Sequence, residues 1–129
     1  MKEPHWLNRE VALALHDMLL SQYGGCAGVR DQGLLDSALA RPQQAFVYGQ
    51  PTLAELAAAY AAGVIKNHPF LDGNKRTGFM LGAGFLELNG REFFAPEADA
   101  VIRTLALAAG EMSEVAYAQW LEQHSRKVS

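Results

Sequence analysis

One short segment, residues 67–77, gathers side chains that can move protons and bind phosphate. It reads Asn-His-Pro-Phe-Leu-Asp-Gly-Asn-Lys-Arg-Thr. The imidazole of His68 can act as a general base and take the proton of an attacking hydroxyl. Asp72 offers a hard oxygen ligand for Mg²⁺, which commonly takes one or two carboxylates and leaves its other positions to waters and phosphates. A base beside a magnesium ligand is typical of phosphoryl or nucleotidyl transfer.

The residues that follow favour an anion site. Gly73 lets backbone amides approach a phosphate closely, Asn74 offers amide hydrogens, and Arg76 has a forked cation suited to phosphate oxygens. Residues 72–74 are expected to begin a helix, whose free amide groups and positive dipole end attract anions. The sequence therefore predicts a phosphate site at a helix start.

The elements on either side of this segment must hold it in place. Pro69 has no amide hydrogen and restricts the residue before it, so the preceding helix must end near His68. That helix, 53–66, follows a capping box of Thr52 and Glu55. It is apolar nearly all round, as is the later run 79–88, which is typical of helices buried at the centre of a bundle. The segment is therefore expected to join two central helices.

The other elements follow from caps, breakers and periodicity, and the fold class that they predict is all-α. Asn8 can cap a helix over 9–22, and Asp31 can cap a short helix that stops at Pro42. Further along we expect a short extended or hairpin-like segment over 43–51, a short strand over 91–95, a helix over 97–109 and a last helix capped by Ser113. Close helix packing is expected to compensate for glycines 78, 82 and 84 within the second central helix.

Composition limits the class of protein. The chain has 129 residues, of which 50% are hydrophobic and 19% charged, so we expect a single domain over 1–129. A net charge of −3 disfavours direct nucleic-acid binding. The single cysteine, Cys26, excludes an intramolecular disulfide and a multi-thiolate zinc site, and it either packs or is merely tolerated. We see no membrane span or secretion signal, so a cytoplasmic location is expected.

The run from His68 to Arg76, His-Pro-Phe-Leu-Asp-Gly-Asn-Lys-Arg, resembles the signature of the Fic/Doc family. The upstream stretch from Tyr23 to Pro42 resembles the death-on-curing branch, the toxins of toxin–antitoxin pairs. The resemblance extends roughly from Leu7 to Glu122. It implies a compact helical bundle with a small flap near 43–51 that would hold a stretch of a target protein.

By this resemblance His68 would be the general base and Asp72 the Mg²⁺ ligand. Nucleotide and phosphate binding would fall to residues of the next helix start: Gly73, Asn74, Lys75 and Arg76. Phe70 matches a buried aromatic of the motif. The chain has no obvious self-inhibitory Ser/Thr-x-x-x-Glu-Gly or Ser/Thr-x-x-x-Glu-Asn motif, so the resemblance implies inhibition by a separate antitoxin.

Two departures bear on the reaction. Members that transfer nucleotides have glycine where this chain has Lys75, and a second arginine where it has Phe79. In the death-on-curing branch the same lysine accompanies a reversed ATP and transfer of its γ-phosphate to a threonine of elongation factor Tu, which halts translation. A protein kinase toxin is thus the preferred interpretation, with AMP transfer or a catalytically silent binding module as alternatives.

Simpler roles exist for several of these residues. Asp72 can act only as a helix cap, and Lys75 and Arg76 can be surface charges. His16 lies beside the apolar face of the first helix and has no ligand-like spacing to the other histidines. We expect it to pack there or to be half exposed.

Overall fold

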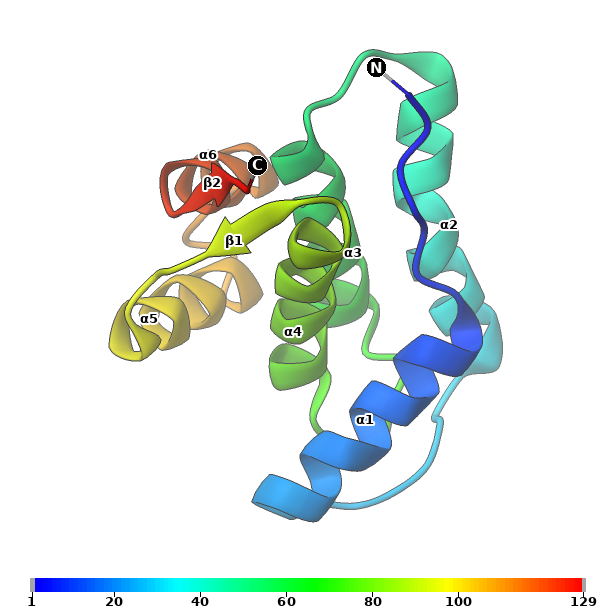
Figure 1. Ribbon diagram of the computed structural model, residues 1–129. Helices are drawn as coiled ribbons and strands as arrows, with labels where there is room; N and C mark the ends of the chain where they lie inside the picture. Colours follow the sequence, from blue (N-terminus) through cyan, green and yellow to red (C-terminus); the bar gives the residue numbers. More distant parts are fainter. Residues whose placement is uncertain (1, 129) are drawn as a thin grey trace.

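The computed structural model describes residues 2–128, and most of these residues lie in helices (Figure 1). The all-α fold class is thereby confirmed. The strands β1 (Arg91–Phe93) and β2 (Ser125–Lys127) pair antiparallel, with Arg91 opposite Lys127 and Phe93 opposite Ser125. The elements are, in chain order, α1 (Arg9–Tyr23), α2 (Gln32–Tyr48), α3 (Leu53–Asn67), α4 (Asn74–Leu88), β1 (Arg91–Phe93), α5 (Glu97–Ala108), α6 (Glu114–Gln123) and β2 (Ser125–Lys127).

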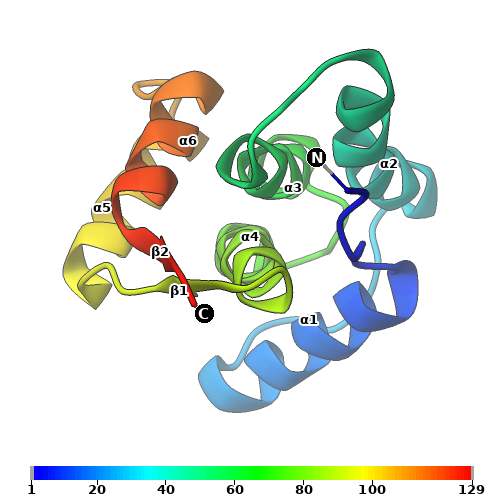
Figure 2. The ribbon, with the colours of Figure 1, turned by 45° about the horizontal axis from the view of Figure 1, so that its top comes forward.

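Helices α3 and α4 lie side by side at the centre, as their apolar composition predicts. The other helices surround them, α1 and α2 on one side and α5 and α6 on the other (Figure 2). Every residue of α3 from Leu56 to Ile65 is buried, because neighbours pack on all sides of this helix. Among residues 2–128 no helix combines the length and the apolar character needed to cross a bilayer.

Small residues bring the two central helices close together. A Cβ at Gly78 would lie 2.8 Å from Cγ1 of Ile65 and 3.0 Å from the carbonyl oxygen of Ala61, and one at Gly82 would lie 3.0 Å from the carbonyl oxygen of Ala57. Close packing therefore accounts for these two glycines, as predicted. The expectation is wrong for Gly84, where a Cβ would meet no atom of the described residues within 4 Å.

This difference predicts opposite effects of adding one methyl group to the same helix. Gly78→Ala is expected to lower the free energy of unfolding by about 1–2 kcal/mol, since overpacking outweighs the gain in helix propensity. Gly84→Ala, the matched control, is expected to raise it by up to about 1 kcal/mol. Urea denaturation of both variants checks this. Equal shifts in the two midpoints would contradict the packing argument.

Helix α2 differs from two expectations. It continues through Pro42 instead of stopping there, and it includes residues 43–48, which were expected to form part of an extended flap. A proline inside a helix costs about 3 kcal/mol, partly through the missing bond to the carbonyl four residues earlier. Here Pro42 is buried, and Phe46, one turn later, packs edge-on against Trp6 at 5.7 Å between ring centroids. The apolar stripe thus extends past the proline, and only residues 49–52 connect α2 to α3.

Candidate active site

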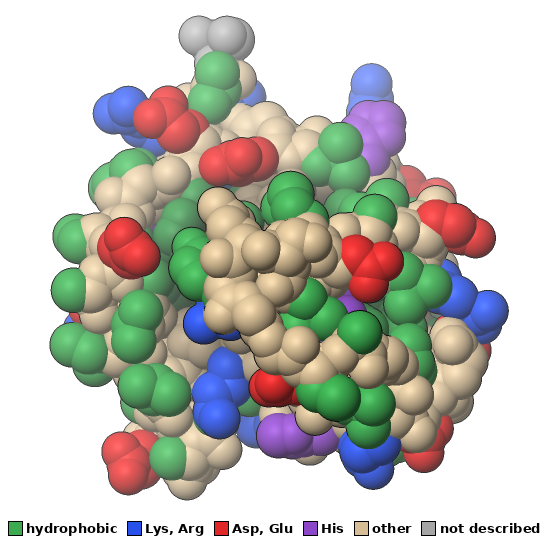
Figure 3. Space-filling view, turned by 90° about the horizontal axis from the view of Figure 1, so that it is seen from below, with side chains coloured by type: hydrophobic (Ala, Val, Ile, Leu, Met, Phe, Trp, Pro, Cys, Tyr) green, Lys and Arg blue, Asp and Glu red, His purple; other side chains and the backbone are tan. Residues whose placement is uncertain are grey.

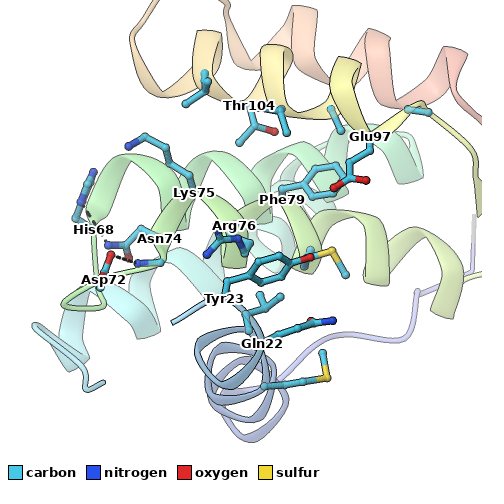
Figure 4. A pocket seen from close by; sticks show the side chains of 18 of the residues that line it. Gln22, Tyr23, His68, Asp72, Asn74, Lys75, Arg76, Phe79, Glu97 and Thr104 are labelled. Atoms are coloured by element: carbon cyan, nitrogen blue, oxygen red, sulfur yellow. Dashed lines mark hydrogen bonds between the residues drawn. The ribbon is translucent and has the colours of Figure 1, made fainter. Parts of the chain in front are cut away.

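A cavity of about 900 Å³ opens at the start of α4. It is lined by the end of α1, the loop 68–73, the first two turns of α4, and residues of β1 and α5 (Figure 4). The space-filling view from below shows basic side chains beside a hollow that hydrophobic side chains border (Figure 3). All the site residues predicted from the sequence line this cavity.

His68 directly follows the last residue of α3 and is its C-cap, so the helix ends where Pro69 predicts. Its backbone is left-handed, with φ 51° and ψ 55°, and among residues 2–128 no other non-glycine residue has a positive φ. The exposed ring lines the cavity, where Nδ1 lies 3.4 Å from Nδ2 of Asn74. This long contact holds the ring beside α4 without fixing which ring nitrogen carries the proton. The imidazole is therefore accessible from the cavity.

The carboxylate of Asp72 is oriented by two backbone amides. Oδ2 accepts from the amide of Cys26 at 3.1 Å and Oδ1 accepts from the amide of Gly73 at 2.8 Å. These bonds, the one from Cys26 foremost, hold the pKa of Asp72 below its usual value, so the group is ionised at neutral pH. Cys26 is itself exposed, so its thiol is tolerated rather than packed.

The donor set at Asp72 suits Mg²⁺ held together with a phosphate substrate. Each carboxylate oxygen keeps a second lone pair free for a metal. Within residues 2–128 no cluster of three or more His, Cys, Asp or Glu side chains forms a complete protein cage. Magnesium commonly binds through one or two carboxylates plus waters and phosphates, so Asp72 fits this role.

The first turn of α4 presents free amides, as predicted. Gly73 is the residue before the helix and has φ 79°, a left-handed conformation that glycine adopts without strain. Within residues 2–128 no side chain caps this helix start, and the first amide bonded to a carbonyl is that of Thr77, to Gly73. The amides of residues 74–76 have no acceptor in the described part of the chain, so they can bind an anion.

The side chain of Asn74 has a role that the sequence did not indicate. It is 5% exposed, and it accepts from the amide of Phe70 and donates to the carbonyl of the same residue, both at 3.0 Å. It therefore braces the loop between His68 and Asp72 instead of presenting its amide hydrogens to a phosphate. What Asn74 can offer an anion is its backbone amide.

Two cations face the cavity. Lys75 and Arg76 are exposed and line it, and neither forms an ion pair with another residue in the range 2–128. The guanidinium of Arg76 stacks over the ring of Tyr23 at 4.2 Å, a cation–π contact that steers it toward the end of α1 (Figure 4). Their positive charge is thus available to a ligand.

The far part of the cavity is less charged. Phe79 forms part of its wall and contacts Phe93 with ring centroids 5.8 Å apart. Glu97 and Thr104 line the same region from α5 (Figure 4). The cations therefore gather at one end of the cavity, beside the start of α4, and an aromatic side chain stands one turn further along.

His16 is a part of this site that sequence reasoning missed. The ring is 2% exposed, stacks on Phe70 with centroids 3.8 Å apart, and donates from Nε2 to the carbonyl oxygen of Asp72 at 2.8 Å. It therefore supports the loop from beneath. The sequence signal was only a histidine beside an apolar face, and nothing in its spacing connects it with Asp72.

Comparison with known proteins agrees with the motif. Residues 6–86 match the model of the Fic/DOC family. The chain is 43% identical over 93 residues to "Toxin Doc" of Mycolicibacterium smegmatis, covering 70% of this chain and 68% of that protein. It is 34% identical over 119 residues to "Protein kinase doc" of Escherichia phage P1, covering 91% of this chain and 93% of that protein. The chain therefore belongs to the Fic/DOC family.

Proposed function

We propose that this protein is a toxin-type protein kinase that transfers the γ-phosphate of ATP to a hydroxyl of a target protein. The observation that carries the proposal is the cavity itself, in which an accessible imidazole stands beside the start of α4, an ionised carboxylate and two cations that form no ion pair within residues 2–128. The similarity to a phage protein named as a kinase, over almost the whole of both chains, supports it.

In the proposed mechanism the imidazole of His68 takes the proton of the target hydroxyl as its oxygen attacks the γ-phosphorus. A new O–P bond forms, the bond from that phosphorus to the β–γ bridging oxygen breaks, and ADP leaves with the electron pair. The free amides of α4 and the guanidinium of Arg76 stabilise the phosphoryl oxygens. Asp72 would hold Mg²⁺, which neutralises charge on the phosphates when bound.

The side chains of Lys75 and Phe79 favour phosphate transfer over AMP transfer. A lysine at position 75 occupies space at the helix start where a glycine would admit a second phosphate. Phe79 gives an aromatic wall where an arginine would contact the γ-phosphate of a conventionally bound nucleotide. A charge-assisted contact of that kind contributes about 1.5–3 kcal/mol, so its absence weakens the conventional pose. A reversed ATP, with its γ-phosphate on the α4 amides, avoids both problems.

The target and the partner are proposed from the family resemblance. We take the target to be a threonine of elongation factor Tu, whose modification would halt translation in the cytoplasm, and the inhibitor to be a cognate antitoxin. The protein "Toxin Doc" of Mycolicibacterium smegmatis supports the toxin class. Residues 43–48 belong to a helix, so any segment that holds the target differs here from the expected extended flap.

Labelled ATP tests the reaction directly. With purified elongation factor Tu and Mg²⁺, label on the γ-phosphate is expected to appear on the target, and label on the α-phosphate is not. Intact mass then gives the addition of one phosphate. The same mixture with the His68→Ala variant provides the background. Labelling only from the α-phosphate would replace the kinase with an AMP transferase, and labelling from neither would favour a silent binding module.

A further inference from the structure

The segment between α1 and α2 runs along the loop that carries the candidate catalytic residues. We call residues 26–31 the strap and residues 68–72 the catalytic loop. Val29 and Phe70 form an antiparallel bridge between them. Backbone hydrogen bonds join the two segments further: the amide of Leu71 to the carbonyl of Gly28 at 3.0 Å, and the amides of Arg30 and Asp31 to the carbonyl of Pro69 at 2.7 and 3.0 Å.

One side chain of the strap reaches the end of α3. The guanidinium of Arg30 donates from Nε to the carbonyl oxygen of His68 at 2.7 Å and from Nη2 to that of Asn67 at 2.8 Å. Carbonyls at a helix C-terminus lack partners within the helix, and a cation there also interacts favourably with the helix dipole. The planar guanidinium of Arg30 therefore binds the carbonyl oxygens of the last two residues before Pro69.

The two hydrogen bonds from Arg30 hold a backbone conformation that is unfavourable. His68 has a left-handed backbone, which a non-glycine residue adopts only where its surroundings enforce it. The backbone of His68 sets where its ring points, and the ring is what the proposed reaction uses. We infer that Arg30 is a positioning residue, which fixes the backbone of His68 so that the imidazole faces the cavity. This inference rests on the proposed function.

The strap itself does not depend on this side chain. Its bridge and its backbone bonds to the catalytic loop involve no side-chain atom of Arg30, and the amide of Cys26 binds Asp72 at its other end. Arg30→Ala therefore removes the two carbonyl contacts and leaves the pairing in place. Arg30→Lys keeps the positive charge but lacks the planar guanidinium, so it is less suited to donate hydrogen bonds to both carbonyls at once.

Kinetics and NMR together test the inference. In Arg30→Ala, kcat for γ-phosphate transfer is expected to fall about 10- to 100-fold, because small displacements of a catalytic group are costly. KM for ATP is expected to stay within about twofold, since the α4 amides and Arg76 are unchanged. Arg30→Lys is expected to lie between wild type and Arg30→Ala. Arg126→Ala is the matched control, because Arg126 is an exposed arginine paired with Glu92 at 3.1 Å.

The second readout does not need activity. In the wild type the backbone ¹³C shifts of His68 are expected to indicate the left-handed conformation that the structure shows. In Arg30→Ala they are expected to move away from those values, while the shifts of α4 stay unchanged. Unchanged His68 shifts, or a rise in KM that accounts for the lost activity, would overturn the inference. If wild type transfers no label, the proposed function fails, and the His68 shifts alone decide whether Arg30 holds this backbone.

Discussion

His68→Ala is expected to lower the rate of γ-phosphate transfer by about 100- to 10,000-fold, the usual contribution of a general base. The side chain is exposed at the end of α3 and lines the cavity, so its removal leaves the core untouched. The methyl group that remains cannot accept the proton of the attacking hydroxyl. Initial rates with γ-labelled ATP measure the loss, and ATP affinity by calorimetry is expected to change little.

A second histidine provides the control for this experiment. His5 is also exposed, and its backbone bonds to the side chain of Asn89 survive substitution. His5→Ala is therefore expected to transfer phosphate at the wild-type rate. A His68→Ala variant that modifies the target as fast as wild type would remove the imidazole from the mechanism.

Asp72→Asn is expected to reduce transfer by at least about 100-fold, because metal-assisted charge stabilisation contributes several kcal/mol to such reactions. The amide side chain keeps the shape of the carboxylate but lacks its charge and one of its acceptor oxygens. Transfer by the variant should need much more Mg²⁺, so the readout is a Mg²⁺ titration of the initial rate. Asp17→Asn, an exposed carboxylate on α1 outside the cavity, is the matched control.

The pH dependence of Asp72 follows from its depressed pKa. The folded state favours the ionised form, so its contribution to stability is present above the unfolded pKa and is lost as pH falls through the folded pKa. Asp72 therefore stays ionised, as the proposed Mg²⁺ binding requires, down to a pH below the usual pKa of an aspartate side chain.

The Mg²⁺ titration of Asp72→Asn has one contrary outcome. An unchanged Mg²⁺ requirement in this variant would show that the metal is held elsewhere.

The helix boundaries show where sequence reasoning succeeds. The side chains of Asn8, Asp31, Thr52 and Ser113 each accept from the backbone of the helix that they precede, as predicted. These signals lie within a few residues of the structure that they specify. The local pattern does not predict the end of α2, because the burial of Pro42 and the contact of Phe46 with Trp6 depend on packing against other segments.

The same distinction applies to the site. The sequence predicts that His68, Asp72 and a helix start are neighbours, because they lie within one short run and Pro69 and Gly73 fix its local geometry. The residues that support this run come from distant parts of the chain, and helix packing brings them there. His16 comes from α1 and Arg30 from the strap, and each reaches the catalytic loop across more than 35 residues of sequence, with separations of 56 and 38. Such contacts depend on how the helices pack, and the local sequence pattern of a single segment does not specify that packing.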